Sequence, residues 1–241
     1  GVTMQSETMQ NQALQNNTMH DNIAFNKTAF IEQLLAHDVL RFGQFSLKSG
    51  RISPYFFNAG QLSSAQSLAQ LASGYASLLA EHNSKSRAND DVLTLFGAAY
   101  KGIPFVAATA YALWRDYGID ANWGYNRKEA KTHGEGGMLV GADLAGKAVW
   151  VIDDVITAGT AIREVAQLLD TAGASLAGIV VALDRKERGQ NEQSAVQEVA
   201  QTFGVGVYSL LDIDDIIAFL GQNGDDEHLP KMQAYREQYG V

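Results

Sequence analysis

The stretch that decides the fold is VWVIDDVITAGTAIREV, residues 149–165. Its first four residues are apolar and predict a buried strand, and two adjacent carboxylates, Asp153 and Asp154, follow at the carboxyl end of that strand. The small and hydroxylated residues 157–160 then lead into a helix. A strand, a small-residue loop and a helix N-terminus form the arrangement in which backbone N–H groups hold a phosphate. We therefore expect an anion-binding loop at this point of the chain.

Two common phosphate-binding motifs do not account for this loop. The Gly-Lys-[Ser/Thr] of a Walker loop is missing, and so are the glycines of the dinucleotide fingerprint. The alternative interpretation is an ordinary strand-to-helix turn that carries two solvated aspartates. The paired carboxylates favour a ligand site, because α/β sheets bind their ligands at the carboxyl ends of the strands.

The segments on either side of the loop alternate between strand and helix patterns. Strands are expected at 92–96, 121–125, 148–152, 176–183 and 205–211. Helices are expected at 65–81, 103–117, 161–172, 192–202 and 214–220, and a loop is expected at 82–91. This order predicts an α/β fold in which a parallel sheet carries helices on both faces.

The N-terminal part of the chain has a different pattern. Residues 1–25 are polar and of low complexity and begin with glycine, so we expect a disordered or tag-derived segment. Asn26 then precedes a helical pattern at 27–35, and residues 39–60 predict two short strands around a turn at 48–51. No repeat or proline-rich linker interrupts the remainder. We therefore expect one domain over 26–241, with a core at about 65–220 and a small hood formed by 26–60 and C-terminal elements.

Composition and charge exclude several classes of function. The 241 residues are 46% hydrophobic and 19% charged, as in ordinary soluble globular proteins. With 18 basic and 27 acidic residues the net charge is −9, which argues against a generic nucleic-acid binder and a polybasic membrane-surface protein. The absence of cysteine excludes disulfides, thiolate catalysis and cysteine-ligated metals, and no apolar run approaches the ~20 residues of a membrane-spanning helix.

The sequence Asp-Asp-Val-x-Thr-x-Gly-Thr from Asp153 onward resembles the phosphoribosyl-pyrophosphate (PRPP) motif of the type I phosphoribosyltransferases, and it is complete. Four further segments resemble the orotate phosphoribosyltransferases within that family, in the same order along the chain. They are 47–60, 96–104, 125–137 and 183–189, and with the motif they cover nearly all of the chain after residue 38. One departure is Ala98, which stands where the family often has proline.

The resemblance implies a fold, a reaction and partners. The fold is a type I phosphoribosyltransferase-like parallel sheet with a hood and a flexible lid loop. The reaction transfers ribose 5-phosphate from PRPP to N1 of orotate, giving orotidine 5′-monophosphate and pyrophosphate in de novo pyrimidine (UMP) biosynthesis. Mg²⁺ would be held mainly through the substrate, with water-mediated contacts to Asp153 and Asp154. The enzyme would be a cytoplasmic homodimer in which loop 126–137 completes the neighbouring site.

The resemblance also assigns individual residues. The catalytic residues it implies are Lys131, Asp153 and Asp154. Contacts to PRPP are implied for Lys48, Tyr100, Lys101, Arg127, Lys128, Lys131, His133, Asp153, Asp154, Val155, Ile156, Thr157, Ala158, Gly159, Thr160 and Ala161. Contacts to orotate are implied for Lys48, Phe56, Phe57, Thr157 and Arg185. Phe56 and Phe57 are consecutive in a strand and face opposite ways, so at least one is expected in the core.

Some of these residues also have ordinary structural explanations. Lys101 could be a surface lysine beside a half-buried tyrosine, but Gly97 and Gly102 on either side would permit close backbone approach to a ligand. Lys48 could belong to an ordinary charged turn. Arg185 could form a strand-terminal ion pair with Asp184 or Glu187 instead of binding the orotate carboxylate.

The charged loop 126–137 has two interpretations of its own. It could be a solvated loop, and His133 could be a solvated side chain. Its glycines favour a hinged lid, and we expect few groups in it that could pin it to its own subunit. Half of the 18 basic residues lie in the candidate ligand segments, which suits a compact polyanion.

Two other functions compete with this interpretation. A phosphoribosyltransferase for a purine or another pyrimidine is disfavoured by Arg185 and the Phe56–Phe57 segment, since a carboxylate-bearing base needs a cation. A PRPP-sensing regulator on the same fold would usually carry a basic nucleic-acid-binding module, and residues 1–25 are too short and polar for one.

Overall fold

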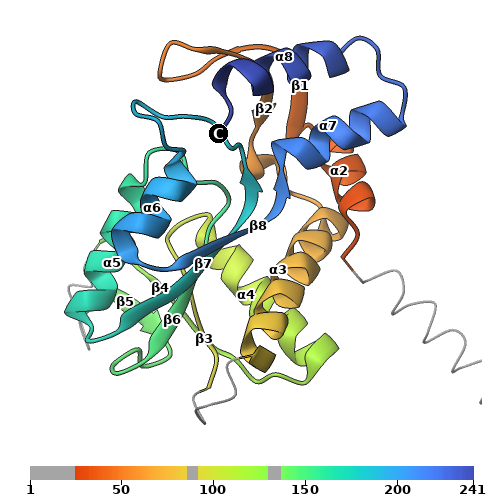
Figure 1. The fold of residues 1–241 in the computed structure, drawn as a ribbon. Coiled ribbons are helices and arrows are strands. Elements are labelled where there is room, and N and C mark those ends of the chain that lie inside the picture. Colours follow the sequence, from red (N-terminus) through yellow and green to blue (C-terminus); the bar gives the residue numbers. More distant parts are fainter. Residues whose placement is uncertain (1–24, 86–91, 130–136) are drawn as a thin grey trace, which may run out of the picture.

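A computed structural model of the chain describes residues 25–85, 92–129 and 137–241. Its main feature is a six-stranded sheet in the order β5-β4-β3-β6-β7-β8 (Figure 1). The strands are β3 (Thr94–Gly97), β4 (Asn122–Asn126), β5 (Leu139–Gly141), β6 (Ala148–Ile152), β7 (Ser175–Asp184) and β8 (Gly206–Asp212). Neighbouring strands pair in parallel except β5, which runs antiparallel to β4. The expected parallel sheet is therefore a mixed sheet with one antiparallel edge strand.

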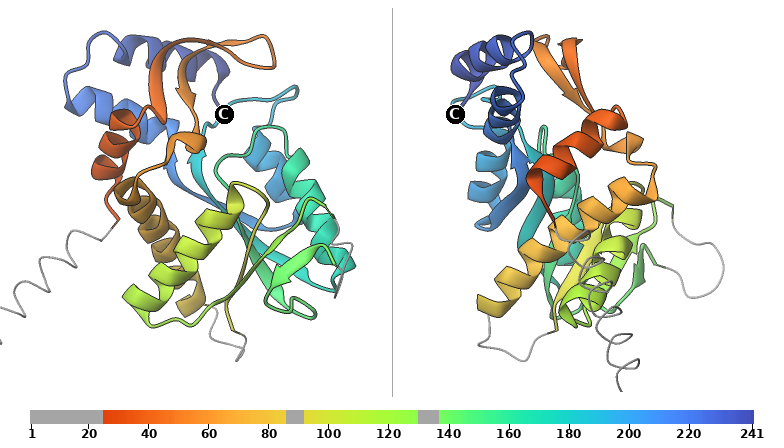
Figure 2. Two further views of the ribbon diagram at one scale, coloured as in Figure 1. Left: turned by 180° about the vertical axis from the view of Figure 1, so that it is seen from behind. Right: turned by 90° about the vertical axis from the view of Figure 1, so that its right-hand side faces the viewer.

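Helices cover both faces of this sheet, as the alternation of elements predicts. They are α3 (Ala65–Lys85) and α4 (Gly102–Tyr117) on one face, and α5 (Thr160–Thr171) and α6 (Ala195–Phe203) on the other (Figures 1 and 2). Successive strand residues enter opposite layers: Val151 packs in the cluster with α5 and α6, whereas Ile152 packs in the cluster with α3 and α4. The period of two along a strand thus fills both layers.

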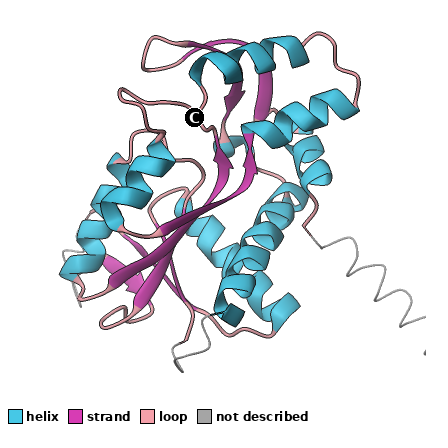
Figure 3. Cartoon of the chain, viewed as in Figure 1, coloured by secondary structure: helices cyan, strands magenta, loops and turns pink. Residues whose placement is uncertain are grey.

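A second, smaller sheet forms the hood above the carboxyl ends of the main sheet's strands (Figure 3). Its strands are β1 (Leu40–Ser46) and β2 (Ile52–Phe57), which pair antiparallel. Around them lie α2 (Lys27–Ala36), the 3-10 helix η1 (Ala59–Gln61), α7 (Ile213–Gln222) and α8 (Leu229–Tyr239). As the sequence predicts, Asn26 caps α2: its side chain accepts a hydrogen bond from the Ala29 N–H at 2.9 Å.

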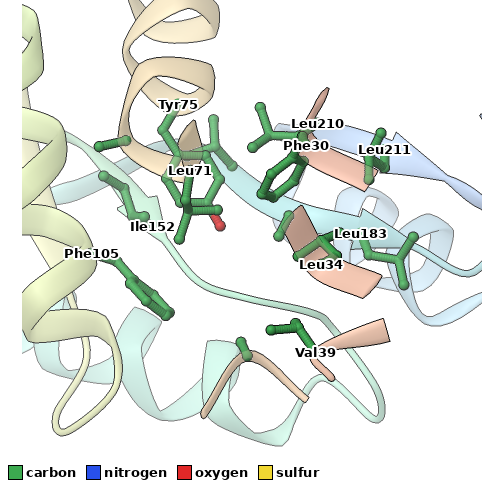
Figure 4. Packing of buried hydrophobic residues seen from close by; sticks show 14 of the residues in the cluster. Phe30, Leu34, Val39, Leu71, Tyr75, Phe105, Ile152, Leu183, Leu210 and Leu211 are labelled. Atoms are coloured by element: carbon green, nitrogen blue, oxygen red, sulfur yellow. The ribbon is translucent and has the colours of Figure 1, made fainter. Parts of the chain in front are cut away.

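The hood and the main sheet share one hydrophobic cluster. Leu71 and Tyr75 of α3 lie between Ile152 of β6 and Phe30 and Leu34 of α2 (Figure 4). All five side chains are at most 1% exposed. Burial of this size stabilises each large side chain by about 1.5–3 kcal/mol, so the hood is held firmly over the strand ends.

Three predictions about elements were incomplete. Strand β5 was missed because it has three residues and pairs only with β4. Helix α8 was missed because only Met232 and Tyr235 of its residues are buried, which leaves little apolar periodicity. The loop expected at 82–91 begins later than predicted, since α3 continues to Lys85.

The expected disordered segment 1–25 lies outside the described residues except for Phe25. Phe25 packs edge-on against Phe30, with ring centroids 5.5 Å apart, so this last residue of the segment is part of the packed hood. Within the described ranges, no helix is both long and apolar enough to span a membrane.

Candidate active site

The two adjacent carboxylates follow the carboxyl end of β6 and remain in register with β7. The Asp153 N–H donates to the Val180 carbonyl at 3.0 Å, and the Asp154 carbonyl accepts from the Ala182 N–H at 2.7 Å. Asp153 Oδ1 accepts from the Asp154 N–H at 2.8 Å, and Asp154 Oδ1 accepts from the Val155 N–H at 2.9 Å. These bonds fix both carboxylates at the edge where α/β sheets bind ligands.

The surroundings of the pair separate the pKa values of its members. Burial, reinforced by the neighbouring Asp154 carboxylate, raises the pKa of Asp153 to about 7. Burial would also raise the pKa of Asp154, but hydrogen bonds from Asp153, Lys101 and the Val155 N–H outweigh it and lower that pKa. Asp154 is therefore the resident anion of the site, and Asp153 gives up its proton only near neutral pH.

Lys101 lies at the carboxylate pair and is not a free surface lysine. Its Nζ is 2.9 Å from Asp154 Oδ2, across a sequence separation of 53 residues. The lysine side chain is 62% exposed while that of Asp154 is 9% exposed, so the cation covers a nearly buried anion from the solvent side. The structure thus joins the 96–104 segment to the PRPP motif.

The two glycines of that segment, Gly97 and Gly102, pack closely against each other. A Cβ on Gly97 would lie 2.1 Å from the Gly102 carbonyl oxygen, so the two residues approach each other closely. Tyr100 is 66% exposed at the apex of the loop, and the Ala99–Tyr100 peptide bond is cis.

The loop after the carboxylates presents an uncapped helix N-terminus. Gly159, at φ +72°, precedes α5, and no side chain caps the first turn of that helix. Ile156 is buried, whereas Thr157, Ala158, Thr160 and Ala161 are exposed. Backbone N–H groups and threonine hydroxyls therefore face solvent at a helix N-terminus, which suits a phosphate. Val155 instead lies beside Leu183 in a parallel bridge.

Tyr75 is a residue of the site that the sequence did not reveal. Its hydroxyl donates to the Asp153 carbonyl at 2.7 Å, and the side chain is fully buried (Figure 4). Burial raises the pKa of this hydroxyl well above its ordinary value, so it stays a donor. A tyrosine in an Ala/Leu-rich helix reads as a core residue, and nothing in the pattern signals its partner.

Arg185 follows the end of β7 and is engaged within its own chain. Its Nε and Nη2 lie 2.8 and 2.7 Å from Glu187 Oε1, and Nη2 also donates to Ser53 Oγ at 2.9 Å. The alternative ion pair with Glu187 is thus present, whereas Asp184 instead accepts from the Lys186 N–H at 2.9 Å. Ser53 is a further residue that sequence reasoning did not place here.

The candidate orotate contacts in the hood lie on β2 and in the turn between β1 and β2. Phe57 packs against the shared hydrophobic cluster, which confirms that one of the pair faces the core. Phe56 faces the other way and stacks on Phe45, with ring centroids 5.4 Å apart. Lys48 lies in the exposed β1–β2 turn, and among the described residues no hydrogen bond or ion pair joins it to the other candidates.

The loop 126–137 is described only at its two ends, and these ends are pinned to their own chain. Asn126 Oδ1 accepts from the Ala99 N–H at 2.8 Å, Arg127 donates to the Gly137 carbonyl at 3.1 Å, and the Lys128 ammonium lies 5.1 Å from the centre of the Tyr100 ring. The expectation of few anchoring groups is wrong for these ends. Lys131 and His133 lie outside the described residues.

The donors at the edge of β6 fit a hard divalent cation. No group of three or more metal-ligating side chains occurs in the described ranges. Mg²⁺ commonly takes one or two carboxylates and completes its shell with water and substrate phosphates. Asp153 and Asp154, with Asp154 ionised, match that requirement.

Comparison with known proteins places the chain in a family. The model of the phosphoribosyl transferase domain matches residues 63–210. Over 213 residues the chain is 56% identical to an orotate phosphoribosyltransferase of Acinetobacter baumannii, covering 88% of this chain and 95% of that one. It is 51% identical to an orotate phosphoribosyltransferase of Pseudomonas aeruginosa, covering 88% and 97%.

A solved structure extends the likeness to three dimensions. The crystal structure of the orotate phosphoribosyltransferase from Francisella tularensis superposes with a TM-score of 0.76 at 40% identity, covering 88% of this chain and 96% of that one. These matches in sequence and in three dimensions show that the chain belongs to the orotate phosphoribosyltransferases, within the phosphoribosyl transferase domain family.

Proposed function

We propose that the chain transfers the 5-phosphoribosyl group of PRPP to N1 of orotate, releasing pyrophosphate and forming orotidine 5′-monophosphate for UMP synthesis. The activity is that of a pentosyltransferase, EC 2.4.2.10. One observation carries the proposal. Asp153 and Asp154 are hydrogen-bonded along β7, and Arg185 follows the end of that strand, so a ribose-binding pair and a carboxylate-binding cation share one edge.

The reaction is a displacement at ribose C1. The bond from C1 to the pyrophosphate oxygen breaks and its electron pair leaves with pyrophosphate. The N1 electron pair of orotate forms the new bond with inversion, and the proton of N1 is released to solvent. Positive charge develops on the ribose in the transition state, and Asp153 and Asp154 stabilise it electrostatically. Asp153 and Asp154 would hold Mg²⁺ together with the substrate, and the ion would supply positive charge to the leaving pyrophosphate. No protein nucleophile takes part.

Lys101 has to change partners during this reaction. Its Nζ lies 2.9 Å from Asp154 Oδ2. The pyrophosphate of PRPP offers the lysine more negative charge than one carboxylate does. We propose that PRPP draws Lys101 away and leaves Asp154 free to face the ribose, with Tyr100 beside the same phosphates.

The remaining substrate contacts follow the family pattern. The 5′-phosphate lies on the N-terminus of α5, held by the loop from Val155 to Ala161. Orotate lies between this loop and the hood, where Lys48, Phe56, Phe57 and Thr157 contact it and Arg185 binds its carboxylate. Residues 26–241 form a single domain in this proposal, and the cysteine-free composition suits a reducing cytoplasm.

We further propose a homodimer in which loop 126–137 completes the partner's site. Helix α4 begins at the Lys101 loop and exposes Tyr111 and Trp114, at 65% and 61%. Large aromatic side chains exposed together are typical of an interface. A second copy on this face would lie next to the PRPP site, and Arg127, Lys128, Lys131 and His133 would place their positive charge on the leaving pyrophosphate.

An ultraviolet assay of orotate tests the reaction. With PRPP and Mg²⁺ present, the purified chain is expected to consume orotate, and omission of either component is expected to abolish turnover. The matched control is Arg185→Ala, which should lose most of the activity while its circular dichroism spectrum is retained. Failure of the native chain to consume orotate with both components present would refute the proposal.

A further inference from the structure

We propose that Glu187 and Tyr235 are positioning residues that hold Arg185 ready for the carboxylate of the base. Through them the C-terminal helix α8 sets the discrimination between a base that carries a carboxylate and one that does not. The inference rests on the proposed function, in which Arg185 binds that carboxylate.

The guanidinium of Arg185 is fixed on one edge and on one face. Glu187 Oε1 accepts from Nε at 2.8 Å, Ser53 Oγ accepts from Nη2 at 2.9 Å, and the guanidinium carbon lies 3.9 Å from the centre of the Tyr55 ring. Among the described residues no hydrogen bond engages Nη1. An arginine otherwise has about 2 kcal/mol of side-chain rotational entropy to lose. Fixing one edge in advance leaves the Nη1 end for an incoming carboxylate.

The second oxygen of Glu187 is held from helix α8. Tyr235 donates its hydroxyl to Glu187 Oε2 at 2.9 Å, and the side chain of Tyr235 is only 5% exposed. Arg51 Nη1 lies 3.6 Å from the same oxygen. With one oxygen on Arg185 and the other on Tyr235, the carboxylate plane of Glu187 cannot rotate without breaking a bond. Tyr235 therefore fixes Glu187, and Glu187 fixes Arg185.

The main chain ties α8 to the loop that carries Arg185. The Arg188 N–H donates to the Tyr239 carbonyl at 2.9 Å, and the Val241 N–H donates to the Lys186 carbonyl at 2.9 Å. The residues on both sides of Glu187 are thus anchored to the end of α8 and the residues after it. Helix α8 carries no residue of the proposed substrate site. It nevertheless sets the geometry of the loop that carries Arg185.

Two charge-conserving variants separate positioning from simple electrostatics. Tyr235→Phe removes only the hydroxyl, which holds Glu187 and also interacts with the Arg185 guanidinium. Glu187→Asp keeps the negative charge but shortens the side chain, so that it cannot span Arg185 and Tyr235 together. The matched control is Tyr239→Phe, which removes a hydroxyl from the same helix. Within the described residues, the only hydrogen-bond partner of that hydroxyl is Gln238.

The readout is the affinity for two nucleotides that differ by one carboxyl group, orotidine 5′-monophosphate and uridine 5′-monophosphate, measured by calorimetry. In both variants the preference for orotidine 5′-monophosphate is expected to fall about five- to tenfold, which is the net magnitude of one ordinary hydrogen bond. Affinity for uridine 5′-monophosphate and the KM for PRPP are expected to stay within about twofold, and Tyr239→Phe should behave as the native chain.

Each alternative result has a definite meaning. An unchanged preference in both variants, or an equal loss of affinity for both nucleotides, would overturn the positioning role. A native chain that consumes orotate but whose variants keep the preference would overturn the inference alone. A native chain without any preference for the carboxylated nucleotide would overturn the carboxylate-binding role of Arg185 as well.

Discussion

Replacing Asp153 with asparagine is expected to abolish most turnover and at the same time to stabilise the fold above neutral pH. The loss of rate follows from removing one carboxylate that faces the positive ribose, for which about 10²–10³ in kcat is a reasonable magnitude. The double variant Asp153→Asn with Asp154→Asn is expected to be at least as inactive and to remain folded, because both side chains lie at a strand end and not in a hydrophobic cluster.

The gain in stability follows from the raised pKa of Asp153. An unfolded aspartate ionises near pH 3.9, whereas in the folded chain burial and Asp154 raise the pKa to about 7. Stability contributed by this group is therefore full below about pH 4, is lost as the pH rises, and is fully lost above about pH 7. Asparagine does not ionise and so loses no stability as the pH rises. The difference in Tm between Asp153→Asn and the native chain should therefore grow from pH 5 to pH 7 and then level off.

Thermal unfolding at pH 5, 6, 7 and 8 measures this effect. A gain of a few degrees at pH 8 is expected, at about 2–4 °C per kcal/mol for a chain of this length. Asp170→Asn, on the exposed side of α5, is the matched control and should show no such pH dependence. A lower Tm for Asp153→Asn at pH 8 than for the native chain would mean that the carboxylate stabilises the fold instead.

Mixing two inactive variants is expected to restore activity if the site is shared between subunits. The variants are Lys131→Ala in the loop and Arg185→Ala at the end of β7. Lys131→Ala alone should lower kcat far more than it raises the KM for orotate, because a cation on the leaving group acts mainly in the transition state. In a hybrid dimer one site carries both defects and the other carries neither, so about a quarter of native sites should return after random exchange.

The control for this experiment is a second mixture, of Arg185→Ala with Asp154→Asn. Both residues belong to the body of the same chain, so each site of the hybrid keeps one defect and no activity should return. If the loop served its own chain, the first mixture would behave in the same way as this control. No recovery after subunit exchange verified by mass spectrometry would therefore contradict the shared site and leave the reaction unaffected.

The sequence predicts those parts of the fold that depend on residues close together along the chain. The strand before Asp153 is five apolar residues long, and its alternation already divides Val151 from Ile152 between the two layers. The Asn26 cap of α2 and the turn between β1 and β2 rest on local turn and cap chemistry in the same way. The PRPP motif is local too, because one loop supplies both the carboxylates and the helix N-terminus.

Contacts between residues far apart in the sequence could not be predicted from it. Tyr75 meets Asp153 across 78 positions, and Tyr235 meets Glu187 across 48. Neither tyrosine differs in its local pattern from a core residue of a helix. The ion pair of Lys101 with Asp154 joins two segments that were each recognised, but nothing in the sequence states that the lysine rests on that carboxylate before substrate arrives.

The most direct test of the account is a competition between bases for limiting PRPP. Equal concentrations of orotate, uracil, adenine and hypoxanthine are supplied with Mg²⁺ and the native chain, and the nucleotides formed are identified by mass spectrometry. Because Arg185, anchored by Glu187, is proposed to bind the carboxylate of the base, orotidine 5′-monophosphate is expected as essentially the sole product, with pyrophosphate released in equal amount. Formation of a purine nucleotide or of uridine 5′-monophosphate at a comparable rate would contradict the account.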